Sequence, residues 1–202
     1  GFGKSGKDGV VSALARHKLK PVAEGSVERN SQQVEGAVAQ IAKANPQAVI
    51  MVTLFKPTAE FVRQMRKAGQ SPQFSTLSPI GADILVAEMG AREAHGIGIS
   101  QAMPYPWNDT LPVVREYHKA LQAFAKHGNY SYYGLEGFIN AKLMAEAIRK
   151  TGKDLTREKL INALESSNFD LGGYKLGYTP ANHNGSRFVD LTVLSRDGRV
   201  LR

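Results

Sequence analysis

Cysteine is absent from the 202 residues, and no apolar run is long enough to cross a bilayer. Without cysteine the chain forms no disulfide, carries no thiol nucleophile and has no cysteine-ligated zinc site, whereas the absence favours neither cytoplasm nor periplasm. One of the longest apolar runs, Ala48 to Phe55, is far shorter than the roughly 20 residues of a membrane helix. The sequence therefore predicts a globular chain without a membrane span.

The net charge of +8 does not indicate a nucleic-acid partner, because the 26 basic residues are interspersed with 18 acidic ones. No basic tract with interleaved aromatic residues is present, so we predict an ordinary solvated surface. Catalytic signatures are also missing, since Ser5 does not lie in a Gly-x-Ser-x-Gly elbow. We expect neither an enzyme nor a cofactor. The histidines lie too far apart in sequence to predict a metal pair: His17, His95, His118, His127 and His183.

The opening GFGKSGKDG matches two nucleotide-binding patterns in part. Gly1, Gly3 and Gly6 fit the dinucleotide pattern G-x-G-x-x-G, but no strand precedes them. The phosphate-binding pattern fails at Asp8, which stands where a hydroxyl would meet magnesium. We therefore predict that these glycines let the backbone turn closely into a helix at the mouth of a cleft. A chain that begins inside such a motif is not expected to start at the natural N-terminus.

The first half alternates helical and strand-like patterns, which predicts βαβ units and a mostly parallel sheet. The continuous apolar run of residues 47–55 predicts a strand buried on both faces. Asn30 or Ser31 is a plausible cap for the second helix. Expected helices span residues 8–17, 31–44, from Pro57 to Gly69, and 81–89, and expected strands span residues 21–27, 47–55, 73–78 and 96–103.

The second half begins at a proline-rich linker and continues with helices. Thr156 is expected to cap the last of these helices, and Gly152 to close the one before it. Asp197 and Gly198 predict a hairpin turn between two terminal strands. The expected segments are a linker at 104–112, helices at 111–126, 133–150 and 156–166, and strands around 188–194 and Val200.

Candidate binding residues follow the predicted strands, because ligands collect at the carboxyl ends of strands in an open α/β sheet. Phe2 joins them, since the start of the first helix belongs on the same edge. From pattern alone, Phe2 and Phe55 fit a core position equally well. The positions just past the apolar runs are Leu54, Phe55 and Lys56, then Ser78 and Pro79, then Met103, Pro104 and Tyr105.

The order and spacing of several stretches carry a resemblance over nearly the whole chain. The chain resembles the solute-binding proteins of bacterial ABC importers of the leucine/isoleucine/valine-binding type, the type I periplasmic binding proteins. The stretches are residues 2–6, 28–30, 47–69, 96–107, 131–152, 155–166 and 182–199.

The resemblance implies an α/β fold of two parallel-sheet, Rossmann-like lobes joined by a hinge, with a small ligand trapped between the lobes by hinge closure. It implies a periplasmic protein whose partner is the membrane permease of an ABC transporter, and whose ligand is an amino acid, an amide, or an aromatic or aliphatic acid. The first lobe is expected to be incomplete in this chain. The implied divisions are 1–103 for the second lobe without its first strand, 104–110 for a crossover, 111–178 for first-lobe helices and the return crossover, and 179–202 for terminal strands of the second lobe.

Position by position, the resemblance places Phe2 over the ligand and Leu54 or Phe55 at a second aromatic position. Ser78 stands where amino-acid binders often carry an acidic residue for the α-amino group. Because a hydroxyl is a poorer partner for a buried ammonium than a carboxylate, we hypothesise that the ligand is not a plain branched-chain amino acid. Pro79 and Tyr105 complete the predicted site.

Two other classes stay open at this point. The same fold also serves ligand-sensing regulatory modules for amides or amino acids. A secretion signal before the present sequence would favour transport, whereas a helix-turn-helix would favour a repressor. The other open class, a nucleotide-dependent enzyme, is indicated by the opening glycines alone. This hypothesis predicts nucleotide binding that weakens when Lys7 is replaced by alanine.

Overall fold

A computed structural model describes residues 1–29, 31–125 and 128–202. The chain forms two compact units, the first made of residues 1–100 and 191–202 and the second of residues 101–190. No helix in these described ranges is long and apolar enough to span a membrane. Three predicted features lie outside the described residues: the cap at Asn30, the helix end at Lys126, and His127.

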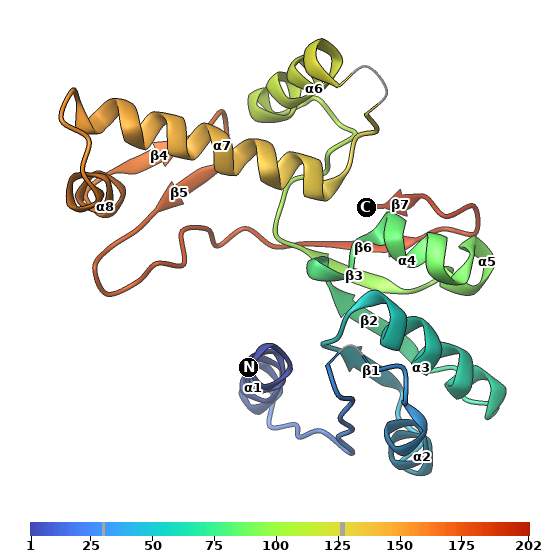
Figure 1. The fold of residues 1–202 in the computed structure, drawn as a ribbon. Coiled ribbons are helices and arrows are strands. Elements are labelled where there is room, and N and C mark those ends of the chain that lie inside the picture. The colour runs from blue at the N-terminus through green and yellow to red at the C-terminus, as the bar shows by residue number, and fades with distance from the viewer. Residues whose placement is uncertain (30, 126–127) are drawn as a thin grey trace. The chain divides into compact units, whose positions relative to one another are not determined.

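The first unit is built on a five-stranded sheet in the order β1-β2-β3-β6-β7 (Figure 1). The first three strands are parallel, whereas β6 and β7 form an antiparallel hairpin. The predicted turn at Asp197-Gly198 is confirmed, with Gly198 at a φ of 80°. The strands are β1 (Ala48–Met51), β2 (Gln73–Leu77), β3 (Gly98–Gln101), β6 (Asp190–Leu194) and β7 (Val200–Leu201), and the helices are α1 (Phe2–Arg16), α2 (Glu35–Lys43), α3 (Phe55–Lys67), the 3-10 helix η1 (Ser78–Ile80), α4 (Ala82–Met89) and α5 (Ala91–Ala94).

Amphipathic helices bury one face of this sheet. The predicted stripes of α2 and α3 are confirmed, since their apolar residues are buried. Phe61 of α3 meets Phe74 of β2 edge-on, with ring centroids 6.5 Å apart. The core of the first unit therefore lies between β1–β3 and α2–α4. The confirmed inward residues are Val34, Val38 and Ile41, then Phe61, Val62 and Met65.

The opposite face of the sheet is largely exposed in the described residues. Ile50 of β1 keeps 49% of its surface accessible, and Leu191 and Val193 of β6 are also exposed. The prediction of a strand buried on both faces is therefore wrong for residues 47–55. The strand ends at Met51, and in the described residues β1 pairs with β2 alone.

Helix α1 begins at Phe2, six residues before the predicted start at Asp8. Gly3 and Gly6 lie inside this helix, so the predicted glycine turn is wrong. Gly6 faces Val52, where a Cβ would come within 2.5 and 2.6 Å of the two valine methyl carbons. The glycine thus permits close packing of α1 beside β1, on the side away from α3 (Figure 1).

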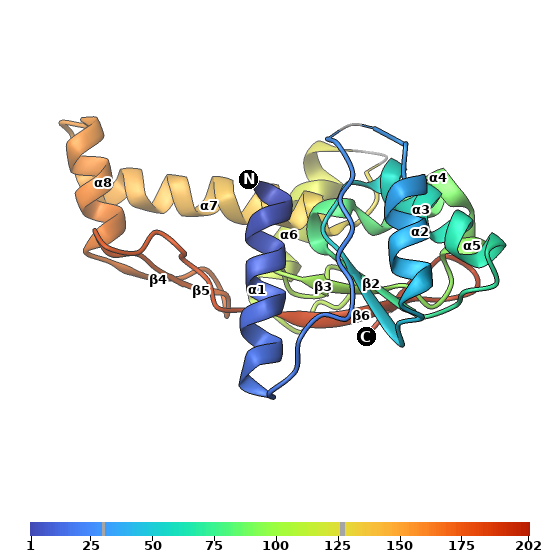
Figure 2. The same cartoon turned by 90° about the horizontal axis from the view of Figure 1, so that it is seen from below.

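The segment of residues 21–27 is not a strand, contrary to prediction. It runs from α1 toward α2 as an extended chain (Figure 2), and Gly25 packs on Ala37 of α2, where a Cβ would lie 2.9 Å from the alanine Cβ. The predicted cap at Ser31 is also wrong, because its hydroxyl accepts a hydrogen bond from the Gln33 N–H before α2 begins at Glu35. Local pattern suggested a strand, but the described residues offer this segment no strand partner.

In its described residues, the second unit holds three helices and one short hairpin. Thr156 caps α8 through a hydrogen bond from the Lys159 N–H, as predicted, and Gly152 follows α7 at a φ of 74°. The hairpin of β4 and β5 was not predicted. The elements of the second unit are α6 (Pro112–Phe124), α7 (Tyr132–Thr151), α8 (Arg157–Glu165), β4 (Asn168–Asp170) and β5 (Lys175–Gly177). The buried core of this unit comprises Val113, Val114, Tyr117, Leu135, Ile139, Leu143, Ala147, Phe169, Leu171, Tyr174 and Leu176.

The turn between β4 and β5 predicts a pH-dependent stability. The Asp170 carboxylate accepts hydrogen bonds from the Gly173 N–H at 2.7 Å and the Gly172 N–H at 3.1 Å. The Gly173 bond holds the pKa of Asp170 below its ordinary value. A lowered folded-state pKa stabilises the fold above the unfolded pKa, and this stabilisation is lost as the pH falls through the folded pKa. We expect Asp170→Asn to lower the free energy of unfolding at about pH 7 and to have little effect near about pH 2.

Urea unfolding of wild type and Asp170→Asn across this pH range measures the effect. Asp154→Asn is the control, because it removes an exposed carboxylate of the same unit, which lies 3.7 Å from the Lys159 ammonium. An equal loss for Asp170→Asn at both ends of the range would contradict the role of the ionised carboxylate.

Candidate functional site

The carboxyl ends of β1 and β2 bring the predicted residues of the first unit to one edge of the sheet. Met51 is paired with Thr76, whose hydroxyl donates to the Met51 carbonyl at 3.0 Å. Leu54 and Ser78 therefore follow neighbouring parallel strands, at the edge where ligands collect in such sheets. We call this edge the rim and define it by Phe2, Leu54, Phe55, Ser78 and Pro79.

Phe2 reaches the rim through the packing of α1. A Cβ on Gly3 would lie 3.7 Å from the Val52 carbonyl oxygen, and Gly6 contacts the Val52 side chain. The first turns of α1 thus lie beside the end of β1. Phe2 is 48% exposed and Phe55 is half-buried, so Phe2 does not occupy a core position.

Helix α3 presents its N-terminal end at the rim. It starts after Leu54, and it has neither a side-chain cap nor an acidic residue in its first turn. The first N–H groups of a helix lack intrahelical partners and carry a partial positive charge. The rim therefore favours a negatively charged group over a positively charged one.

Tyr105, the remaining predicted residue, belongs to the second unit. Its ring lies 5.0 Å from that of Trp107 and 6.5 Å from that of Tyr132, and the last two rings are 5.7 Å apart. We call these three residues the aromatic cluster. The sequence did not predict that Trp107 and Tyr132 lie beside Tyr105, although the aromatic spacing in Tyr105-Pro106-Trp107 was a visible signal.

Two hydrogen bonds anchor the segment that carries Tyr105. The Tyr174 hydroxyl donates to the Ala102 carbonyl at 2.9 Å, and His118 Nε2 donates to the Pro106 carbonyl at 2.7 Å. Burial raises the pKa of the Tyr174 hydroxyl above its ordinary value, so it remains a donor at neutral pH. The His118 ring also stacks on Tyr130, with centroids 3.7 Å apart. The segment is therefore held firmly within its unit.

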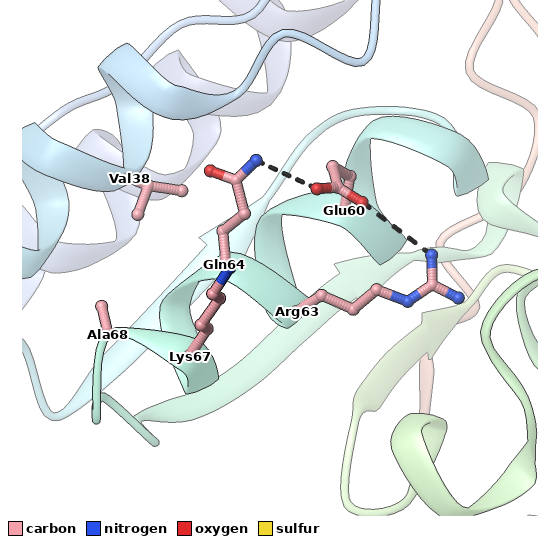
Figure 3. Close-up of a pocket in the computed structure, with 6 residues that line it drawn as sticks. All are labelled: Val38, Glu60, Arg63, Gln64, Lys67 and Ala68. Atoms are coloured by element: carbon pink, nitrogen blue, oxygen red, sulfur yellow. Dashed lines mark hydrogen bonds and ion pairs between the residues drawn. The ribbon is translucent and has the colours of Figure 1, made fainter.

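A surface pocket of about 400 Å³ lies between α2 and α3 (Figure 3). Gln64 Nε2 donates to Glu60 Oε1 at 3.0 Å, and Arg63 pairs with Glu93 at 2.9 Å. These groups satisfy one another, and no rim residue lines the pocket, so it is not the predicted site. Its lining residues are Val38, Glu60, Arg63, Gln64, Lys67 and Ala68.

Metal and nucleotide chemistry find no support in the described part of the chain. No group of three or more histidine, aspartate or glutamate residues there could hold a metal ion. The opening glycines form a helix instead of a phosphate-binding loop. Lys7, which a phosphate loop would need, pairs with Glu24 at 2.9 Å on an exposed surface.

Comparisons with known proteins agree with the family resemblance. A family model described as "Periplasmic binding protein" matches residues 1–199. No curated protein matches the chain. Among solved structures, a possible leucine/isoleucine/valine-binding protein from Rhodopirellula baltica SH 1 is 32% identical with a TM-score of 0.91, over 100% of this chain and 56% of that one.

Two further structures extend the comparison. A substrate-binding periplasmic protein from Ralstonia solanacearum is 35% identical with a TM-score of 0.87, over 99% of this chain and 57% of that one. A branched-chain amino acid ABC transporter protein from Thermus thermophilus with bound valine is 19% identical with a TM-score of 0.76, over 94% of this chain and 53% of that one, and shows the fold alone. The chain therefore spans little more than half the length of these structures.

Proposed function

The chain belongs to the periplasmic binding protein family, and from this we propose that the protein is the solute-binding component of a bacterial ABC importer. In this proposal it works in the periplasm, binds a small solute, and delivers it to a membrane permease. Closure of two lobes around the solute is carried over from the family resemblance. The protein has no catalytic residue in this role.

The rim is the proposed solute-binding surface of the first unit. Phe2, Leu54 and Phe55 supply apolar contacts, and Ser78 and Pro79 follow the adjacent strand. Tyr105 is the proposed contribution of the second unit. The observation that carries the ligand class is electrostatic, because α3 begins at the rim without an acidic residue in its first turn. A solute with a carboxylate fits this surface.

Ser78 refines the ligand class. The relative from Rhodopirellula baltica is described as a possible binder of leucine, isoleucine and valine, which supports an amino-acid-like solute. At Ser78, however, a half-buried hydroxyl offers an ammonium group no compensating charge. We therefore propose a carboxylate-bearing solute without a strict requirement for a free α-amino group.

Phe55→Ala is expected to lower the affinity for the bound solute by about tenfold, because it removes an aromatic contact at the proposed site. Small molecules that co-purify with the protein are identified by mass spectrometry and titrated by calorimetry beside leucine, valine and aliphatic acids. Phe124→Ala is the matched control, since Phe124 is 90% exposed on α6 and should leave affinity unchanged.

Two outcomes would contradict the proposal. Equal affinity of Phe55→Ala and wild type would remove Phe55 from the site. Tight binding of leucine or valine with little affinity for acids that lack an amino group would contradict the proposed ligand class and leave the transport role standing.

A further inference from the structure

The first turn of α3 leaves two backbone donors without a protein partner. The first hydrogen bond within the helix runs from the Thr58 N–H to the Leu54 carbonyl at 3.1 Å, and Pro57 has no N–H to donate. In the described part of the chain, the N–H groups of Phe55 and Lys56 donate to no other group. The start of α3 therefore offers two free donors at the rim.

A lysine stands in the first turn of α3, where an acidic residue would stabilise the helix. Lys56 is exposed and forms no ion pair with any residue that the structure describes. Glu60, one turn further on, is not its partner, because it accepts from Gln64 Nε2 at 3.0 Å and lies 3.9 Å from the Arg63 guanidinium (Figure 3). The helix dipole and Lys56 thus add positive charge at the same end of α3, and no described residue neutralises it.

The Thr58 side chain adds a polar group that the fold itself does not satisfy. Its hydroxyl is fully buried and has no hydrogen-bond partner among the described residues. Because the Cα–Cβ bonds of a helix tilt toward its N-terminus, this hydroxyl points toward the free N–H groups of the first turn. A buried hydroxyl that has lost water without gaining a partner destabilises a fold. A bound molecule at the start of α3 would supply the missing partner.

We propose that the first turn of α3 binds the carboxylate of the solute, with Lys56 as its countercharge and Thr58 as a hydroxyl donor. This inference rests on the proposed solute-binding function and adds both residues to the site. A carboxylate accepts about four hydrogen bonds, so it can accept from the two free N–H groups and from the Thr58 hydroxyl, directly or through a bridging water. An amide lacks the charge that pairs with Lys56, so the solute class narrows from acids and amides to carboxylates.

Calorimetry with the full-length protein tests the inference with hexanoate, hexanamide and leucine as probes. The first two match in length and shape and differ in charge. We expect hexanoate to bind at least about tenfold more tightly than hexanamide, because hydrogen bonds to a charged acceptor are roughly twice as strong as those to a neutral one. Inorganic phosphate, added as a competitor, distinguishes a site for a solute carboxylate from a site for any small oxyanion, and it should not displace hexanoate.

Lys56→Gln removes the countercharge and should weaken hexanoate binding by about fivefold, with hexanamide binding unchanged. Lys67→Gln is the matched control, because Lys67 is an exposed lysine in the last turn of the same helix. It changes the net charge by the same amount and should leave both affinities unaltered. A loss confined to Lys56→Gln assigns the effect to the start of α3.

Thr58→Val keeps the shape of the side chain and removes the hydroxyl. We expect it to weaken hexanoate binding by about tenfold without lowering the thermal unfolding temperature, since the buried hydroxyl has no partner to lose among the described residues. Thr58→Ser keeps the hydroxyl and should bind hexanoate within about threefold of wild type. Lost affinity at unchanged stability separates a role in binding from a role in packing.

Equal affinities for hexanoate and hexanamide would overturn the inference, and so would unchanged hexanoate binding in either Lys56→Gln or Thr58→Val. Displacement of hexanoate by phosphate would indicate a general oxyanion site and overturn the assignment to a solute carboxylate. Tight leucine binding that neither substitution weakens would overturn the inference while the solute-binding function stands. If neither hexanoate nor leucine bound to the folded protein, both proposals would fall.

Discussion

Gly172→Ala is expected to lower the free energy of unfolding of the second unit by about 3 kcal/mol. Gly172 has a φ of 95°, a conformation that costs an L residue roughly 1–2 kcal/mol. A Cβ there would also lie 2.9 Å from the backbone nitrogen of Val113, which donates to the Gly172 carbonyl at 3.1 Å. The alanine therefore pushes β4–β5 away from the start of α6.

Gly152→Ala is the matched control for this prediction. Gly152 has a φ of 74°, but a Cβ there would meet nothing within 4 Å. Gly152→Ala should lower the free energy of unfolding only by the cost of the positive φ, roughly 1–2 kcal/mol. Urea unfolding followed by Trp107 fluorescence reports on the second unit, because the chain has no other tryptophan. Equal losses for both variants would contradict the contact with Val113.

Gly6→Ala is expected to weaken solute binding by about tenfold, through displacement of α1 and of Phe2 with it. The added Cβ would lie within 2.6 Å of both methyl carbons of Val52, whose short side chain cannot move aside cheaply. In a helix interior alanine is normally better than glycine by about 1 kcal/mol. The close contact with Val52 should outweigh this gain, so that Gly6→Ala lowers the free energy of unfolding.

Gly9 provides the control in the same helix, since a Cβ there meets nothing within 4 Å. Gly9→Ala should stabilise α1 by up to about 1 kcal/mol and leave solute affinity unchanged. Thermal unfolding and calorimetry of the two variants test this contrast. Identical behaviour of Gly6→Ala and Gly9→Ala would show that the packing of α1 on Val52 does not position the site.

Features set by local periodicity and capping were predictable from the sequence. The 3.6-residue stripe of Val34, Val38 and Ile41 requires a buried face whatever the partner is, and the structure buries all three. Thr156 caps α8, and the Asp197-Gly198 turn joins β6 to β7, because these motifs involve only neighbouring residues.

Features that depend on distant partners were not predictable. The apolar run of residues 47–55 gave no sign that its strand ends at Met51, or that Phe55 opens the next helix. Because glycines are poor helix formers, the sequence did not indicate that α1 starts at Phe2. The contact between Gly6 and Val52 joins residues that are 46 positions apart in the sequence. Segment 21–27 has strand-like composition but finds no partner in the described sheet.

The candidate site divides in the same way. The rim followed from a general rule, that ligands collect at the carboxyl ends of parallel strands. The neighbours of Tyr105 did not follow from such a rule, because Trp107 and Tyr132 come from a linker and a helix start, and only the folded second unit brings their rings within 5.7 Å.

Amide hydrogen exchange with and without the co-purified solute tests the central claim most directly. The account predicts solute-dependent protection at the rim, in residues 2–5, 52–58 and 78–80, with the pocket between α2 and α3 unchanged. Protection confined to that pocket, around Gln64 and Lys67, with an unaltered rim would contradict the account.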